Sequence, residues 1–132
     1  MMHLLFLDDE VSQIDLMQRY YQRCPLSKIT KAEFFESPLG AINEVKKGGI
    51  DVVILDIKLG NISGYDVISN IARQSKKPKI IAYTGYQKET DVRNRFIDQY
   101  ILKSRGLNYL FSKLEELALK DRHILCDLTA SA

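Results

Sequence analysis

Residues 51–66 read DVVILDIKLGNISGYD, and this stretch decides the fold. Four apolar residues, Val52 to Leu55, run directly into an acid, Asp56, and a glycine-containing loop follows. A short apolar run with such boundaries is typical of a strand that is buried on both faces of a parallel sheet. A carboxylate at the end of that strand is costly to remove from water, so other parts of the chain must supply its partners.

Short apolar runs alternate with longer amphipathic segments along the rest of the chain. The short runs predict strands at residues 4–7, 29–35, 51–55, 78–83 and 100–102. Apolar residues at three- and four-residue spacing predict helices at residues 11–23, 38–47, 63–72, 87–97 and 107–118. This alternation implies an α/β fold, a doubly wound parallel sheet with helices on both faces. The length suits the flavodoxin-like (βα)5 arrangement with strand order 2-1-3-4-5.

The composition is that of one soluble globular domain. The chain has 132 residues, of which 45% are hydrophobic and 27% charged. A net charge of +2, spread along the chain, argues against direct nucleic-acid binding. No apolar run approaches the ~20 residues of a membrane span, and the first residues lack the pattern of a signal peptide. We therefore expect a cytoplasmic protein without membrane contact, with Cys24 and Cys126 as free thiols.

Polar side chains stand where four of the predicted strands end. Asp8 and Asp9 follow the first strand and Asp56 follows the third, which is its neighbour in the expected order. Three converging carboxylates repel one another unless a cation is present, and oxygen ligands of this kind select Mg²⁺. Thr84 would add a hydroxyl donor and Lys103 a fixed positive charge. Such a set is suited to phosphoryl transfer onto an aspartate.

Each of these residues, taken singly, has an ordinary structural explanation. An acidic pair can cap the following helix, a lone aspartate can begin a turn, and a lone lysine is usually a solvated charge. Helix capping does not explain why acids stand at the ends of two adjacent strands. Nor does it explain why a threonine and a lysine stand at the ends of the next two strands. The combination therefore favours a functional site.

These pieces resemble the receiver domain of two-component response regulators, in particular single-domain regulators of the chemotaxis type. The matching motifs are LLFLDDE at 4–10, DVVILDIKLGNISG at 51–64, IAYTG at 81–85 and YILK at 100–103. Each motif alone is weak evidence for this family, whereas four motifs in this order are strong evidence for it. The resemblance covers about residues 2–120, which implies a receiver domain at 1–122 and a patternless tail at 123–132.

The resemblance implies a phosphorylation site with a bound metal. Asp56 would accept a phosphoryl group from a phosphohistidine, carried by a histidine kinase or a histidine phosphotransfer protein. Asp9 would bind Mg²⁺ directly and Asp8 would bind it through water. Asp56 itself and the backbone carbonyl of Lys58 would complete the protein ligands. The protein would catalyse only its own phosphorylation and dephosphorylation.

The resemblance also implies a conformational switch. Lys103 would pair with the phosphoryl group, Thr84 would hydrogen-bond to it, and Gly85 would leave room for it. Tyr100 would turn inward when Thr84 moves, and the affinity for a downstream protein partner would change. The face expected to change comprises residues 87–97, 100–102 and 107–118.

Some positions depart from the family's pattern. Ser104 follows Lys103 where the family usually has proline, which puts the family's cis peptide bond in doubt, because a non-proline cis bond costs ~3 kcal/mol. Gly60 stands where proline is common, and Phe96-Ile97 replaces a small Gly-Ala pair. None of these changes removes a residue that the chemistry needs.

Other functions fit the sequence less well than that of a receiver domain. A dehalogenase-type phosphatase needs a second acid two residues after the nucleophile, where this chain has Lys58. A flavin-nucleotide binder needs a phosphate loop after the first strand, where acids would repel the phosphate. Three alternatives stay open: an interaction module that works without phosphorylation, a receiver fragment of a longer regulator or hybrid kinase, and a form that acts as a homodimer.

Overall fold

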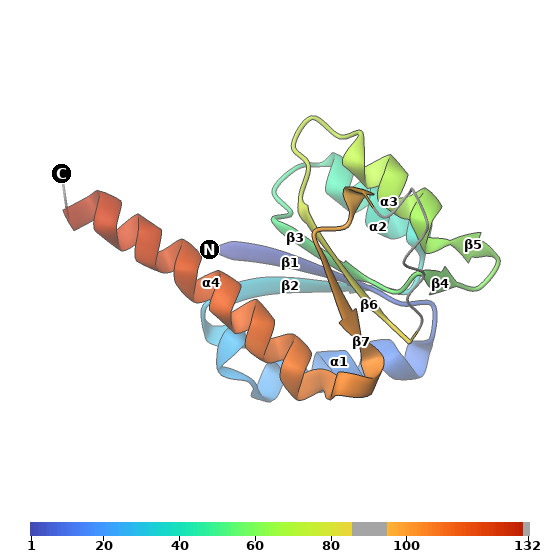
Figure 1. Cartoon of the computed structure of the whole chain (residues 1–132), viewed down its shortest axis with the longest axis horizontal. Helices are drawn as coiled ribbons and strands as arrows, with labels where there is room; N and C mark the ends of the chain where they lie inside the picture. The colour runs from blue at the N-terminus through green and yellow to red at the C-terminus, as the bar shows by residue number, and fades with distance from the viewer. Residues whose placement is uncertain (86–94, 131–132) are drawn as a thin grey trace.

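A parallel five-stranded sheet forms the centre of the protein (Figure 1). The computed structural model describes residues 1–85 and 95–130, with residues 122–130 as backbone only. The strands of the sheet are β1 (Met2–Leu7), β2 (Thr30–Phe35), β3 (Val52–Leu55), β6 (Lys79–Thr84) and β7 (Gln99–Leu102). Their spatial order is β2-β1-β3-β6-β7, so the predicted 2-1-3-4-5 order is confirmed.

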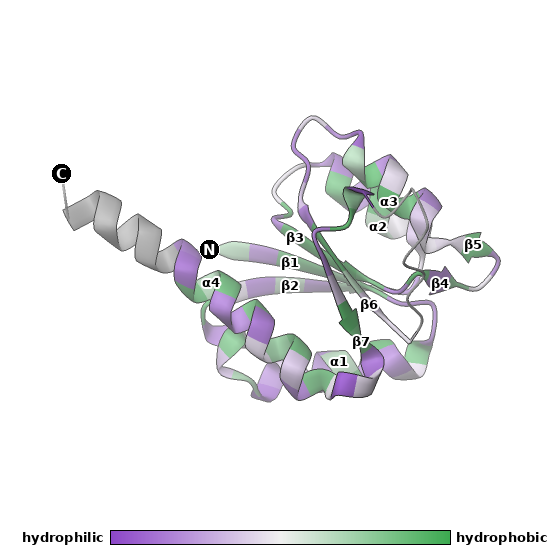
Figure 2. Cartoon of the chain, viewed as in Figure 1, coloured by the Kyte–Doolittle hydropathy of each residue, from purple (hydrophilic) through white to green (hydrophobic). Residues whose placement is uncertain are grey.

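Helices cover both faces of the sheet, as predicted (Figure 1). They are α1 (Val11–Arg23), α2 (Pro38–Lys46), α3 (Gly64–Ala72) and α4 (Gly106–Ala130), with short 3-10 turns η1 (Pro25–Lys28) and η3 (Lys103–Arg105). Helices α1 and α4 pack on one face, and α2 and α3 on the other, each with its apolar side toward the sheet (Figure 2). The helix predicted at 87–97 falls largely outside the described residues.

Strand β3 is buried on both faces, as its unbroken apolar run predicts. Side chains alternate between the faces of a strand. Val52 and Ile54 accordingly pack into the core under α1 and α4, whereas Val53 and Leu55 pack into the core under α2 and α3. The strand that carries Asp56 at its end is therefore fixed by apolar contacts on both sides.

Helix α1 has the predicted bounds, because the spacing of its apolar residues and the proline after it indicate the same segment. Ile14, Met17 and Tyr21 recur at three- and four-residue spacing and are buried against the sheet. The helix ends at Arg23, and Pro25 then opens the η1 turn. Because Val11 directly follows the acids at the end of β1, the first turn of α1 lies at the carboxyl edge of the sheet.

Helix α4 continues well beyond the predicted end at residue 118 and runs to Ala130. Its inward side chains Leu110, Phe111, Leu114 and Ala118 match the predicted apolar face. The sequence from Leu119 to Ala130 has no strong apolar pattern, but it also contains no glycine or proline that would stop a helix. Adding a residue to an existing helix is far easier than starting a new one, which accounts for the extension.

The loop after β3 contains a short hairpin that the sequence analysis did not predict. Strands β4 (Lys58–Leu59) and β5 (Ile62–Ser63) pair antiparallel around the two-residue turn Gly60-Asn61. Gly60 has a φ of +59°, a left-handed conformation that glycine adopts without strain. A glycine at the first position of a two-residue turn is typical of tight hairpins.

Gly64 allows α3 to begin directly on the backbone that follows Asp56. Its amide donates a hydrogen bond to the carbonyl oxygen of Ile57 at 2.6 Å. A Cβ at this position would lie 2.6 Å from both the Asp56 carbonyl oxygen and the Ile57 Cα. Only a residue without a side chain fits there, so Gly64 fixes the distance between α3 and the loop.

The substitution Gly64→Ala tests this contact. We expect it to lower the free energy of unfolding by about 2 kcal/mol or more, because backbone atoms rather than a flexible side chain must move to admit the methyl group. Urea denaturation monitored by circular dichroism measures the change. Gly85→Ala is the matched control, since a Cβ there meets no atom of the described residues within 4 Å, and we expect a change within about 0.5 kcal/mol. Equal effects of the two substitutions would contradict this interpretation.

Candidate functional site

A cleft lies at the carboxyl edge of the sheet, where parallel α/β folds bind their ligands. Its volume is about 660 Å³. The lining residues come from the ends of β1, β3, β6 and β7 and the hairpin: Asp9, Glu10, Asp56, Lys58, Gly60, Thr84, Gly85 and Lys103. The sheet order thus brings together residues that are far apart in the sequence, as predicted.

Lys103 joins two carboxylates from neighbouring strands. Its Nζ donates hydrogen bonds to Asp8 Oδ2 at 3.0 Å and to Asp56 Oδ2 at 2.7 Å. The side chains of Asp8, Asp56 and Lys103 are 3%, 12% and 24% exposed, so the group is largely shielded from water. Charged hydrogen bonds of this length are among the stronger polar contacts in a protein.

Burial and ionic contacts act against each other on the pKa values of Asp8 and Lys103. Burial raises the pKa of the Asp8 carboxyl, and the Glu10 amide and Lys103 offset only part of that rise. Burial also acts to lower the pKa of Lys103, but its hydrogen bonds to Asp56 and Asp8 outweigh this effect and raise that pKa. The ammonium group therefore stays protonated, while the buried carboxylate is incompletely compensated. A further cation in the cleft would stabilise the cluster.

Asp56 is held from both sides by backbone groups. Its own amide donates to the carbonyl oxygen of Leu7 at 3.3 Å, which ties the end of β3 to β1. Its Oδ1 accepts a hydrogen bond from the Lys58 amide at 3.2 Å, while Oδ2 receives Lys103. The carboxylate is thus oriented at the edge of the cleft, with both oxygens accepting a hydrogen bond.

The two acids after β1 lie in different surroundings. Asp8 is 2% exposed and its Oδ1 accepts a hydrogen bond from the Glu10 amide at 3.0 Å, whereas Asp9 is exposed and lines the cleft. Asp9 Oδ2 lies 3.1 Å from the point that a Cβ on Gly60 would occupy. A side chain at position 60 would therefore crowd the Asp9 carboxylate, and glycine leaves space beside it.

The donor atoms around the cleft suit a hard divalent cation. Asp8, Asp9 and Asp56 supply carboxylate oxygens, which Mg²⁺ prefers, and Mg²⁺ usually keeps several of its waters. Among the described residues no group of three or more acid, histidine or cysteine side chains is assembled closely enough to hold a metal by itself. Lys103 lies between Asp8 and Asp56 instead. The residue types and the space beside Asp9 fit the ion, with water completing its shell.

The remaining predicted site residues lie on β6 and β7. Thr84 is 1% exposed at the end of β6, and Gly85 follows it at the cleft. Tyr100 lies apart from the cleft lining, within β7, and packs against the buried residues Ile57, Tyr65 and Ala82. The backbone has no cis peptide bond in the described ranges, so the Lys103–Ser104 bond is trans.

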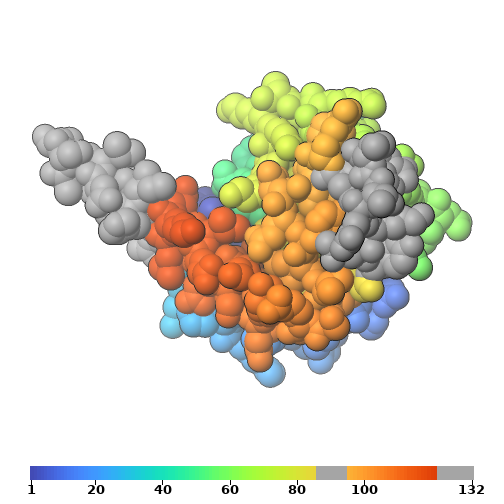
Figure 3. Space-filling view, in the orientation of Figure 1, coloured from blue at the N-terminus to red at the C-terminus, as the bar shows by residue number. Residues whose placement is uncertain are grey.

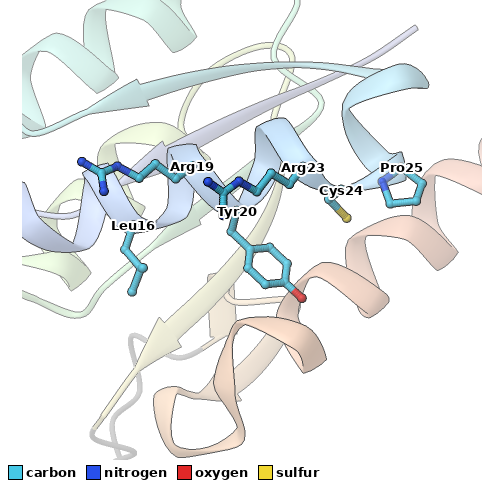
Figure 4. Close-up of a pocket in the computed structure, with 6 residues that line it drawn as sticks. All are labelled: Leu16, Arg19, Tyr20, Arg23, Cys24 and Pro25. Atoms are coloured by element: carbon cyan, nitrogen blue, oxygen red, sulfur yellow. The ribbon is translucent and has the colours of Figure 1, made fainter.

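A second hollow, of about 550 Å³, lies at the C-terminal end of α1 (Figure 4). Its lining residues are Leu16, Arg19, Tyr20, Arg23, Cys24 and Pro25. Tyr20 points toward α4, where its hydroxyl is hydrogen-bonded to Asn108 (Figure 4). Arg19 pairs with Asp15 on the same helix. Because this hollow is at the end of α1 remote from Asp8 and Asp9, it is separate from the carboxylate cleft.

Sequence reasoning did not single out the residues that support the site. The amide of Glu10 holds Asp8, and Gly60 lies beside Asp9. Ser63 caps α3 through a hydrogen bond from the Tyr65 amide at 3.2 Å. The glycines in NISG and KLGN were the available signal for close backbone packing.

None of the helices in the described ranges combines the length and the apolar character that crossing a membrane requires.

Comparisons with known proteins agree with this geometry. The family model of the response regulator receiver domain matches residues 4–115. The response regulator TrrA of Thermotoga maritima, solved in complex with Mg²⁺–BeF, is 30% identical. That match covers 89% of this chain and 99% of TrrA, with a TM-score of 0.75. A complex of the histidine kinase ThkA with TrrA matches at the same identity over 89% of this chain and 98% of the matched chain, with a TM-score of 0.74.

Among curated proteins, the response regulator SaeR of Staphylococcus aureus is 29% identical over 91 residues. Those residues are 69% of this chain but only 38% of SaeR, so the chain spans well under half the length of the curated relatives it matches. The match to the family model covers most of the chain, and the sheet order and the residues of the cleft agree with it. The chain belongs to the response regulator receiver domain family.

Proposed function

We propose that this domain is a phosphorylation switch in which Asp56 accepts a phosphoryl group from a phosphohistidine. The observation that carries the proposal is the Lys103 ammonium, which hydrogen-bonds Asp8 and Asp56 at the edge of an open cleft. A carboxylate with a purely structural role would not need to face an open cleft. The cleft leaves room beside Asp56 for a transferred group, and Thr84 and Gly85 line the same space.

In the proposed reaction, an Asp56 carboxylate oxygen attacks phosphorus and forms an O–P bond. The N–P bond of the donor histidine breaks, and its nitrogen keeps the electron pair and takes a proton from solvent. The Lys58 amide and Lys103 orient the Asp56 carboxylate before the attack. Lys103 then supplies positive charge to the transferred phosphoryl oxygens, and Thr84 supplies a hydroxyl donor.

We propose Mg²⁺ as the cofactor, bound by Asp9 and Asp56, by Asp8 through water, and by the Lys58 carbonyl. The Mg²⁺–BeF complex of TrrA supports this assignment, since TrrA aligns with nearly the whole of this chain. When bound, the ion would neutralise charge on the phosphoryl oxygens. Asp8 and Asp56, which share the single ammonium group of Lys103, and the space beside Asp9 are the features of this chain that suit it.

The proposed output is a change in the surface that includes β7 and α4. Figure 3 shows this side of the molecule, with β7 and the first turns of α4 in orange between α3 and α1. Phosphorylation would draw the buried Thr84 toward the new group, and Tyr100 would repack beside it. A histidine kinase is the proposed donor, because TrrA was solved in complex with the histidine kinase ThkA. The downstream partner would be a protein.

Asp56→Ala tests the phosphoacceptor. We expect wild-type protein incubated with Mg²⁺ and phosphoramidate, a small donor with an N–P bond, to gain one phosphoryl group in intact-mass analysis. We expect Asp56→Ala to gain none, because the nucleophilic carboxylate is lost. Asp15→Ala is the matched control, since Asp15 is an exposed acid on α1 outside the cleft, and it should behave as wild type. Incorporation into Asp56→Ala would contradict the assignment.

Asp9→Asn tests the metal site through stability. At a Mg²⁺ concentration ten times its Kd, binding should stabilise the wild-type protein by about 1.4 kcal/mol. Asp9→Asn should lose most of this gain, because it removes a charged ligand that is exposed and not part of the fold's core. Thermal unfolding with and without Mg²⁺ measures the effect, with Asp15→Asn as control. An unchanged Mg²⁺ effect in Asp9→Asn would rule out its role as a ligand.

Thr84→Ala tests the link between the phosphoryl group and Tyr100. We expect the variant to accept a phosphoryl group on Asp56, while the change in the NMR signals of Tyr100 on phosphorylation becomes much smaller than in wild type. Thr84→Ser keeps the hydroxyl and should retain the change. If the signals of Tyr100 respond in Thr84→Ala as they do in wild type, Thr84 does not transmit the signal.

A further inference from the structure

A small buried cluster lies apart from the two main cores, beside the loop that follows Asp56. Its buried members are Ile57, Tyr65 and Ala82, and Ile97 and Tyr100 pack against them. We call it the Tyr65 cluster. Its residues come from the position next to Asp56, from the first turn of α3, from β6 and from β7. A single set of contacts therefore reaches from the proposed phosphoacceptor to the proposed switch residue.

The backbone fixes Tyr65 to the phosphoacceptor loop. Gly64 donates to the Ile57 carbonyl at 2.6 Å and leaves no space between α3 and the Asp56–Ile57 peptide. Tyr65 follows directly and is 5% exposed. A displacement of the Asp56–Ile57 backbone must therefore carry the start of α3, and the Tyr65 ring, with it.

The sheet places Tyr65 and Tyr100 in the same cluster. Ala82 is paired with Tyr100 in the β6–β7 register, and Ala82 shares a face of the sheet with Thr84, two residues further on. Ala82 is fully buried, and its small side chain leaves room for an aromatic ring. The phenol oxygens of Tyr65 and Tyr100 are both shielded from solvent. Tyr100 thus packs against a cluster to which both Tyr65 and β6 contribute.

We infer that Tyr65 is a positioning residue that sets the balance between the buried and exposed orientations of Tyr100. Its ring forms one wall of the buried site of Tyr100, and its attachment to the Asp56–Ile57 backbone gives phosphorylation a second route to Tyr100, beside Thr84. This inference rests on the proposed function. Tyr65 is not among the described residues that line the cleft, so we do not expect the chemistry on Asp56 to require it.

Fluorine NMR with 3-fluorotyrosine in place of Tyr100 tests the inference, before and after addition of Mg²⁺ and beryllium fluoride. We expect Tyr65→Leu to change the ratio of the two Tyr100 states by about fivefold or more, the lower range of couplings between sites. The variant should still gain one phosphoryl group from phosphoramidate in intact-mass analysis. Tyr20→Leu is the matched control, because it makes the same change at a partly buried tyrosine that packs against the core on the opposite face of the sheet.

Ile57→Val is a second variant, which removes one methylene from the same cluster and keeps the fold. We expect it to shift the Tyr100 ratio in the same direction by a smaller factor, and it decides the question if Tyr65→Leu does not fold. If the folded variants keep the wild-type ratio of the two Tyr100 states, the role of Tyr65 is overturned, while the proposed function is unaffected. A wild-type protein that gains no phosphoryl group and does not respond to beryllium fluoride would overturn the proposed function and this inference together.

Discussion

The contact of one ammonium group with two carboxylates organises the functional edge of this domain. Lys103, Asp8 and Asp56 come from three strands that meet only in the folded sheet, and their charges are largely removed from water. Such a group is stable only when each charge has close partners, because an unpaired buried charge is strongly unfavourable. The backbone amides of Glu10 and Lys58 provide the remaining hydrogen bonds. The apolar packing of β3 and the contact of Gly64 with the loop hold these partners in place.

Much of the fold could be predicted because its determinants are local in the sequence. The apolar run of β3 and the spacing of Ile14, Met17 and Tyr21 in α1 each specify one element without reference to the rest of the chain. The alternation of strands and helices predicts the strand order, and that order places Asp56 beside Asp8 and Asp9. The convergence of the acids, the threonine and the lysine at one edge of the sheet could therefore be predicted from the sequence.

Other features depend on distances that no local pattern encodes. The sequence did not distinguish the buried Asp8 from the exposed Asp9, because either residue of an acidic pair can face inward at a strand end. The hairpin at Gly60 and the contact of Gly64 with Ile57 depend on how α3 meets β3 in space. The extension of α4 to Ala130 was missed because helix continuation needs no apolar pattern, only the absence of a stop signal.

The separation of the site residues along the chain has a consequence for folding. The Lys103–Asp8 contact joins residues 95 positions apart, and the Lys103–Asp56 contact joins residues 47 positions apart. Closing long loops costs conformational entropy, and contacts of high sequence separation slow folding. Both contacts also need β7, the last strand of the sheet, to be docked. A chain still being synthesised, or one that has lost β7, would carry Asp8 and Asp56 without their counter-charge, so the proposed phosphorylation would have to wait until β7 has docked.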